Sequence, residues 1–235
     1  MGEHTVTSFD EELEHIDRLI RDMGDLACSM VKSSTGALVN SDNALAQRII
    51  SDDSVMDARQ RELDEASITL IAKRQPMALD LRSVVGAIRM AADLERIGDL
   101  AKNIAKRVGA VVQTPTQKSL ALSIEGMSEM VLLQIRGVVD AYVARDADVL
   151  RELRNRDEKI DIKYTAVFRE LLTYMMEDPR NITACTHLLF CAKNLERIGD
   201  HVTNIAENAY YTVTGEQLPA QRPKQDETAM AALAE

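Results

Sequence analysis

Apolar residues recur every three or four positions along most of the chain, a spacing that predicts long amphipathic helices. In the first such segment they form one continuous seam at Leu13, Ile16, Ile20, Met23, Ala27 and Met30. Ser8 and Glu11 stand before this seam in the pattern of a capping box, so we expect the first helix to begin there. Turn-forming residues between Val39 and Asn43 predict its end.

The same periodicity predicts five further helices. One ends at about residue 75, and the others span about 78–112, 117–144, 146–177 and 181–212. Pro76 and Pro179 hold corresponding places, each before the third helix of a set of three. We therefore predict an all-α fold of two tandem three-helix bundles, related by internal duplication, at residues 9–113 and 116–214. Proline and polar residues predict a flexible tail at 215–235.

The duplication can be read directly from repeated motifs. The segment Leu94-Glu95-Arg96-Ile97-Gly98-Asp99 recurs unchanged as Leu195-Glu196-Arg197-Ile198-Gly199-Asp200, and Asn103-Ile104-Ala105 recurs as Asn204-Ile205-Ala206. In the preceding helix of each half, a second acidic pair with the same spacing occurs at Asp53 and Asp57 and again at Asp157 and Asp161.

These acidic pairs are candidate metal ligands. Residues four positions apart lie on the same side of a helix, and two like charges there repel unless a cation or a proton neutralises one of them. Asp53 and Asp157 also occupy seam positions where apolar residues are expected. All-oxygen ligands suit Mg²⁺, Mn²⁺ or Ca²⁺, and bridging carboxylates also suit iron or zinc. The predicted ligands are Asp53, Asp57, Glu95 and Asp99 in the first half, and Asp157, Asp161, Glu196 and Asp200 in the second.

The same residues also fit a solvated, ion-paired helix surface, with Asp99 paired to Lys102 and Glu196 to Lys193. The histidines are weaker candidates. His15 lies off the apolar seam, His187 lies on an apolar stretch typical of a core histidine, and His201 points away from its neighbour Asp200 on a helix. The sequence contains neither a Gly-rich phosphate loop nor a nucleophile motif. We therefore expect a protein without enzymatic activity. A carboxylate-bridged metalloenzyme and a purely structural helical scaffold are the alternatives.

Composition narrows the class further. Of 235 residues, 46% are hydrophobic, 28% charged and only 3% aromatic, which is typical of packed helices rather than sheets. The net charge of −10 opposes nucleic acids and anionic membranes as partners. A polar N-terminus and the lack of a long apolar run predict a cytoplasmic protein without membrane insertion. Cys28, Cys185 and Cys191 have no metal-binding or disulfide spacing, so we expect free, buried thiols.

Taken together, the motifs resemble those of the PhoU family of phosphate-uptake regulators. Besides the duplicated segments, the resemblance rests on Ile71–Pro76, Asp80-Leu81-Arg82 and Leu172–Asp178, and it covers residues 9 to 214 approximately. It implies two tandem three-helix bundles and frequent dimerisation, here as a homodimer. It also implies that the eight carboxylates named above hold mono- or multinuclear iron or zinc clusters, or magnesium or manganese.

The resemblance further implies a regulatory role. Members of the family repress the phosphate-starvation response through contact with the phosphate ABC transporter, here its ATPase subunit, and with a partner sensor histidine kinase. We therefore expect a metal-binding adaptor between these two proteins. One departure from internal symmetry concerns Asp80-Leu81-Arg82, which has no recognisable copy near 181–186. If that segment contacts a partner, the two halves are not functionally equivalent.

Overall fold

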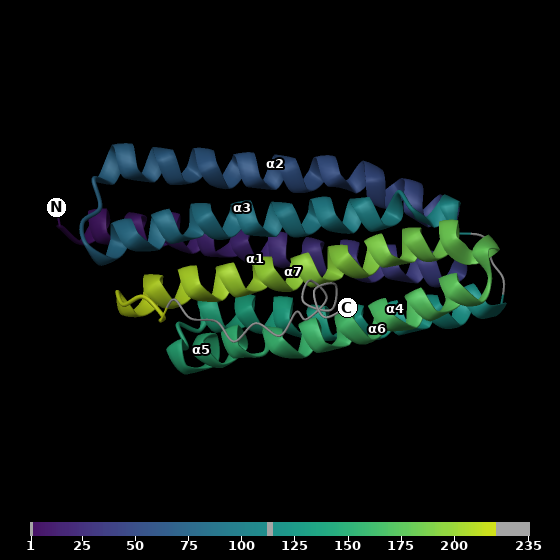
Figure 1. The fold of residues 1–235 in the computed structure, drawn as a ribbon. Helices are drawn as coiled ribbons and strands as arrows, with labels where there is room; N and C mark the ends of the chain where they lie inside the picture. Colours follow the sequence, from purple (N-terminus) through teal and green to yellow (C-terminus); the bar gives the residue numbers. More distant parts are fainter. Residues whose placement is uncertain (1, 112–114, 220–235) are drawn as a thin grey trace.

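A computed structural model describes the backbone of residues 2–111 and 115–219, and their side chains except those of residues 2–8, 115–117, 155 and 157. Within these ranges the chain is all-helical, as predicted (Figure 1). The α-helices are α1 (Gly2–Asn40), α2 (Asn43–Arg74), α3 (Leu79–Ala105), α4 (Pro115–Val143), α5 (Ala147–Asn155), α6 (Asp157–Glu177) and α7 (Ile182–Thr214). Two short 3₁₀ helices, η1 (Val108–Ala110) and η2 (Pro179–Asn181), complete the described fold.

The turn between α1 and α2 repeats the turn between α4 and α5. Ser41 and Arg145 both take left-handed conformations, with φ of 49° and 55°. In each turn the following aspartate caps the next helix, because Asp42 Oδ1 accepts from the Leu45 amide at 2.9 Å and Asp146 Oδ1 from the Val149 amide at 3.1 Å. The shared turn geometry supports an internal duplication.

Three helix boundaries differ from the sequence prediction. Helix α1 begins at Gly2, so Ser8 lies inside the helix and the predicted start there is wrong. The third helix stops at Ala105 and continues as η1, in a segment where valines and Gly109 disfavour an α-helix. The predicted helix at 146–177 is divided at Arg156 into α5 and α6, in a polar segment without apolar residues to hold one straight helix.

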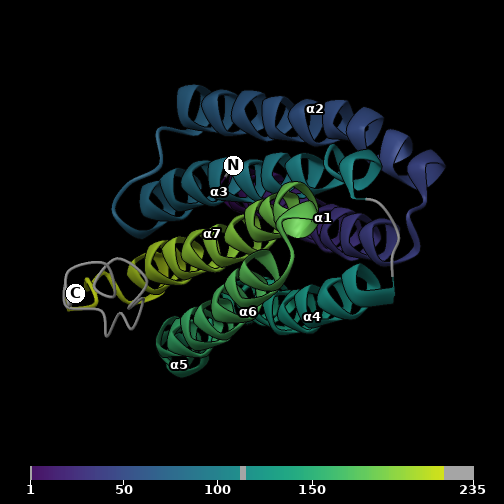
Figure 2. The same cartoon turned by 45° about the vertical axis from the view of Figure 1, so that its right-hand side comes forward.

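Helices α1, α3, α7 and α4 form the centre of the molecule. Helix α1 packs against α3 and α4, and α7 packs against the same two helices. Helix α2 covers one flank of this group, and α5 and α6 cover the opposite flank (Figure 2). The first repeat begins with α1 and ends with α3. The second repeat begins with α4 and ends with α7. Since α3 and α7 run in opposite directions, the repeats are related by an approximate two-fold axis across the long axis of the molecule (Figure 1).

The buried apolar side chains of both repeats form one continuous core. The predicted seam of α1 lies within it from Ile16 onward, while Leu13 is partly buried and packs against it. Ile16, Ile20 and Met23 are at most 1% exposed. Cys28, Cys185 and Cys191 are buried free thiols, as expected. None of the described helices combines the length and the apolar character needed to cross a membrane.

Candidate functional site

Four of the predicted ligands lie along the contact between α2 and α3. Asp53 and Asp57 on α2 and Glu95 and Asp99 on α3 are all partly buried. Gly98 lies within the contact between these helices, where an added Cβ would come 3.2 Å from Met56 Cγ. The absence of a side chain at position 98 therefore lets α3 approach α2 closely beside the two carboxylate pairs. We call these four residues the first carboxylate cluster.

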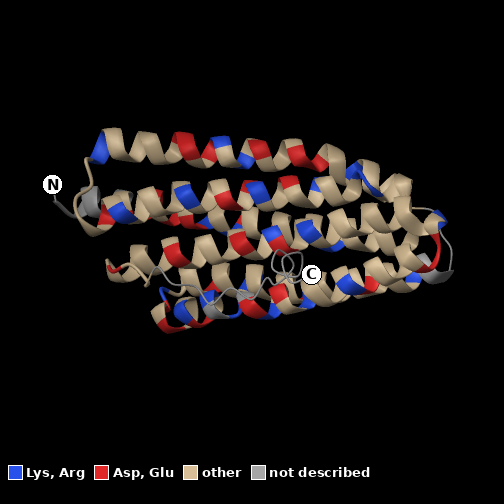
Figure 3. Ribbon diagram, in the orientation of Figure 1, with Lys and Arg blue, Asp and Glu red and all other residues tan. Residues whose placement is uncertain are grey.

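An ammonium group neutralises part of this cluster. Lys102 Nζ lies 2.6 Å from Asp53 Oδ2 and 2.6 Å from Asp99 Oδ1, so it joins α2 to α3. Arg96 adds weaker contacts, at 3.3 Å to Asp99 and 3.6 Å to Glu95. The predicted pairing of Asp99 with Lys102 is therefore confirmed. Acidic and basic residues are interspersed along these helices (Figure 3).

Burial and neighbouring charges shift the pKa values of Glu95 and Lys102 in this cluster. The pKa of Glu95 is raised by burial and then by the charge of Asp99, against a smaller opposing effect of Arg96, and Asp57 and Asp53 raise it further. Burial alone would lower the pKa of Lys102, but its hydrogen bonds to two aspartates more than offset this, and the pKa is raised. Additional positive charge beside the first carboxylate cluster would relieve the remaining repulsion between its carboxylates.

The second repeat places its carboxylates between α6 and α7. Asp161 and Glu196 are buried, and Asp200 is partly exposed. Glu196 Oε1 lies 2.9 Å from Lys193 Nζ, which confirms that predicted pair, whereas its Oε2 is buried without a hydrogen-bond partner. We call these residues the second carboxylate cluster. Asp157 is the first residue of α6, but its side chain lies outside the described part of the structure.

Burial raises the pKa of Glu196, Lys193 opposes this effect, and the charges of Asp200 and Asp161 raise the pKa further. An unpartnered carboxylate oxygen in a buried, acidic setting is a suitable ligand for a cation. The donor chemistry of both clusters thus fits an oxygen-ligated metal. As the side chains are placed, however, no three His, Cys, Asp or Glu residues of the described chain converge closely enough to form a metal site. The eight-residue ligand set remains a prediction.

Some polar contacts could not be foreseen from the sequence. His201 Nδ1 lies 2.9 Å from Asp93 Oδ1 across the interface between α3 and α7. His187 is partly buried, and its Nδ1 lies 3.2 Å from Arg107 Nη1. A hollow lined by basic residues between α3 and α7 was not predicted from the sequence either. The one sequence feature that points to it is the unrepeated segment ending at Arg82. These contacts join helices from different repeats, so no motif within a single helix announces them.

Comparison with known proteins agrees with this architecture. The PhoU domain matches twice, at residues 20–108 and 124–209. A relative from Rhizobium meliloti (strain 1021) is 57% identical over 225 residues, covering 96% of this chain and 95% of the relative. One from Caulobacter vibrioides (strain NA1000 / CB15N) is 48% identical over 226 residues, covering 96% and 98%. Both are named phosphate-specific transport system accessory protein PhoU homolog.

Solved structures show the same fold. The crystal structure of PhoU from Pseudomonas aeruginosa has a TM-score of 0.82 and 34% sequence identity, covering 88% of this chain and 100% of that one. The structure of the phosphate transport system regulatory protein PhoU from Streptococcus pneumoniae has a TM-score of 0.81 and 28% identity, covering 90% and 99%. The two domain matches, the full-length relatives and the shared fold establish that this chain belongs to the PhoU family.

Proposed function

We propose that this chain is a regulator of phosphate uptake and a negative regulator of the phosphate-starvation response. It acts as an adaptor between the ATPase subunit of the phosphate ABC transporter and a sensor histidine kinase. The observation that carries the proposal is the 57% identity, over nearly the full length of both chains, to an accessory protein of phosphate-specific transport. An accessory protein of this kind has a regulatory role and is not named as an enzyme.

The two ends of the molecule suit an adaptor. Where α2 leads into α3, Met77 is 80% and Leu79 60% exposed, and where α6 leads into α7, Met176 is 85% and Ile182 47% exposed. These turns lie at opposite ends of the bundle (Figure 1). Exposed apolar groups of this size favour protein contacts. Two separate apolar ends support simultaneous contact with two partners.

The proposed metal has a structural or signalling role in the carboxylate clusters. In the first repeat the metal would be held by Asp53, Asp57, Glu95 and Asp99. In the second repeat it would be held by Glu196 and Asp161 together with the other two predicted ligands. Each cluster joins the second and third helices of its repeat, so a bound cation, whether iron, zinc, magnesium or manganese, would cross-link them. Metal loading would thereby set how firmly the outer helices are held against the core.

A deletion strain tests the proposal. Without this protein, a reporter of phosphate-scavenging genes should be expressed in rich phosphate, and the wild-type chain should restore repression. Purified, tagged protein should capture the transporter ATPase subunit and the sensor kinase, and Met77→Asp and Met176→Asp should each weaken capture of one of them. Ile68→Asp, at an exposed apolar position on α2, is the matched control. Normal repression in the deletion strain would refute the proposed function.

Further measurements test the remaining features. Elemental analysis of untagged protein beside an Asp99→Ala, Asp200→Ala double variant measures bound metal, and light scattering measures the proposed homodimer. Fractionation should recover the protein from the cytoplasm. Turnover of a substrate by metal-loaded protein, lost in the double variant, would favour the carboxylate-bridged metalloenzyme instead.

A further inference from the structure

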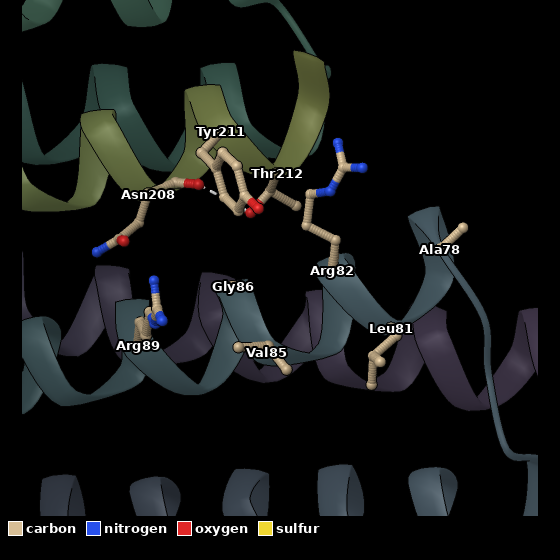
Figure 4. A pocket seen from close by; sticks show the side chains of 9 residues that line it. All are labelled: Ala78, Leu81, Arg82, Val85, Gly86, Arg89, Asn208, Tyr211 and Thr212. Atoms are coloured by element: carbon tan, nitrogen blue, oxygen red, sulfur yellow. Dashed lines mark hydrogen bonds between the residues drawn. The ribbon is translucent and has the colours of Figure 1, made fainter. Parts of the chain in front are cut away.

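A hollow of about 350 Å³ lies between the N-terminal part of α3 and the C-terminal part of α7. Figure 4 shows Arg82 and Arg89 of α3 on either side of Tyr211 of α7, with Asn208 beside Arg89. A second hollow, of about 440 Å³, shares Arg89, Asn208 and Tyr211 and continues toward Pro219. We call the two hollows together the basic groove. It lies away from both carboxylate clusters, at the end of the bundle where α3 begins.

The groove is built by close packing of its two helices. An added Cβ at Gly86 would clash with Thr212 Oγ1 and displace Thr212, so glycine at this position favours the close approach of α3 to α7. The guanidinium carbon of Arg82 lies 5.3 Å from the centre of the Tyr211 ring, and its Nη1 lies against Gly215 at the end of α7. Arg82 is therefore held in place by stacking and packing, which reduces the entropy that a ligand must overcome.

No carboxylate neutralises the two arginines within the described part of the chain. The one acidic residue that lines the groove is Glu207, which accepts a hydrogen bond from Arg154 Nε at 2.9 Å. Asp93, one turn further along α3 from Arg89, contacts His201. In a protein with a net charge of −10, two neighbouring cations without acidic partners form a local site for an anion.

At the opposite end of the bundle, where α7 begins beside the end of α3, side chains occupy the position equivalent to the groove. In the register that aligns Glu95 with Glu196, Gly86 corresponds to His187, Arg89 to Phe190 and Asn208 to Arg107. There the guanidinium carbon of Arg107 lies 4.2 Å from the centre of the Phe190 ring, and Nη1 of the same arginine contacts His187. Among the described residues, the arrangement of the basic groove is therefore not repeated at the opposite end, in line with the unrepeated Asp80-Leu81-Arg82 segment.

We propose that the basic groove binds a small anion with two or more linked phosphate groups, such as pyrophosphate or the phosphate chain of a nucleotide. Guanidinium groups bind phosphate oxygens through paired hydrogen bonds, and the Asn208 amide and Tyr211 hydroxyl add neutral donors. Arg82 and Arg89 are separated by seven residues, a rise of about 10 Å along α3. Linked phosphates reach both arginines better than orthophosphate does. The proposal is independent of the regulatory function proposed above.

Calorimetric titration of the full-length, metal-free protein tests this site. Pyrophosphate, ADP and ATP serve as probes, and orthophosphate is the comparison. We expect saturable binding of at least one linked-phosphate probe, at least tenfold tighter than that of orthophosphate. Arg82→Gln and Arg89→Gln should each weaken it at least tenfold, whereas Arg61→Gln, at an exposed position on α2, should not change it. Circular dichroism and unfolding temperature confirm that each variant is folded.

The pattern of results identifies the ligand. Equal affinity for pyrophosphate and ATP would assign recognition to the phosphate chain, and tighter binding of ATP would assign a nucleotide. The proposal is overturned if no probe binds saturably, if orthophosphate binds as tightly as pyrophosphate, or if the two arginine variants bind like the wild type. Displacement of the probe by an acidic peptide at equal concentration would overturn it in favour of a protein-docking groove.

Discussion

Replacing Lys102 with methionine removes the ammonium group that joins α2 to α3 and keeps an unbranched side chain of similar length. Lys102 contacts Asp53 and Asp99 at 2.6 Å each, and the three side chains are between 17% and 28% exposed. A hydrogen bond to a charged group contributes about 1.5–3 kcal/mol when buried, and an exposed ion pair about 0.5 kcal/mol. For two partly buried contacts we expect a loss of about 2 kcal/mol, which lowers the unfolding temperature by about 4–8 °C in a chain of this size.

This loss should depend on pH. Because the folded-state pKa of Glu95 is raised, its protonated form contributes stability that is fully present below its unfolded-state pKa and is lost as pH rises through the folded-state value. Without the ammonium group, Lys102 no longer balances the charges of Asp99 and Asp53, which raise that pKa, so we expect a further rise. The variant should therefore be closest to wild type near pH 4.5 and most destabilised near neutral pH. Thermal unfolding in a chelator, followed by circular dichroism from pH 4 to 8, measures the difference.

Divalent cations provide the second part of the test. If a metal can replace the ammonium group, Mn²⁺ or Mg²⁺ should stabilise Lys102→Met more than wild type, because a ligand that binds only the folded state raises its stability with concentration. Lys106→Met, at an exposed position beyond the end of α3, is the control and should match wild type throughout. Unchanged unfolding temperatures for Lys102→Met at neutral pH, or an equal effect of metal on all three proteins, would refute the electrostatic reasoning.

Three further substitutions test particular contacts. Gly86→Ala should destabilise the protein by about 1–3 kcal/mol through overpacking against Thr212. In denaturant unfolding, adding Thr212→Ala to the same chain should restore most of the lost stability. Additive effects of the two substitutions would contradict a direct clash. Glu196→Gln should raise the free energy of unfolding at neutral pH by about 1 kcal/mol, because it removes a buried charge with one unpartnered oxygen. The gain should vanish near pH 4, where the wild-type residue is protonated. A gain that does not depend on pH would exclude this cause. Ala78 has φ 51° and ψ −106°, so Ala78→Gly should stabilise by about 1 kcal/mol, whereas Ala58→Gly in an exposed part of α2 should destabilise by a similar amount.

The fold could be predicted from the sequence because its determinants are local. Spacing of apolar residues located the helices, and the repeated Leu-Glu-Arg-Ile-Gly-Asp segment showed that the second half repeats the first. Helix ends were less predictable. The break at Arg156 lies in a polar segment where Arg154 bonds to Glu207 of α7, a contact distant in sequence. A pattern within one helix carries no information on such a partner.

The carboxylate clusters were predictable for a related reason. Residues i and i+4 share a helix face whatever surrounds them, so Glu95 and Asp99 had to point together. That Lys102 would contact both Asp99 and an aspartate of α2 depends on how α2 packs, which the sequence does not state. The basic groove depends entirely on packing between repeats. Tyr211 and Arg82 lie far apart in the chain and are brought together only by the antiparallel contact of α3 with α7.

The approximate two-fold relation between the repeats makes the two proposed kinds of site separable by stoichiometry. Each repeat places carboxylates between its second and third helices, so the metal proposal predicts two cation sites per chain. The groove requires the start of a third helix beside the end of the other one, and this arrangement occurs at both ends of the bundle. At one end, however, His187 and Phe190 stand where Gly86 and Arg89 stand at the other, and Arg107 packs against both. We therefore expect one linked-phosphate anion per chain. Calorimetric stoichiometry measures this directly, and two equivalent anions per chain would show that the filled end also binds and that the asymmetry has been misread.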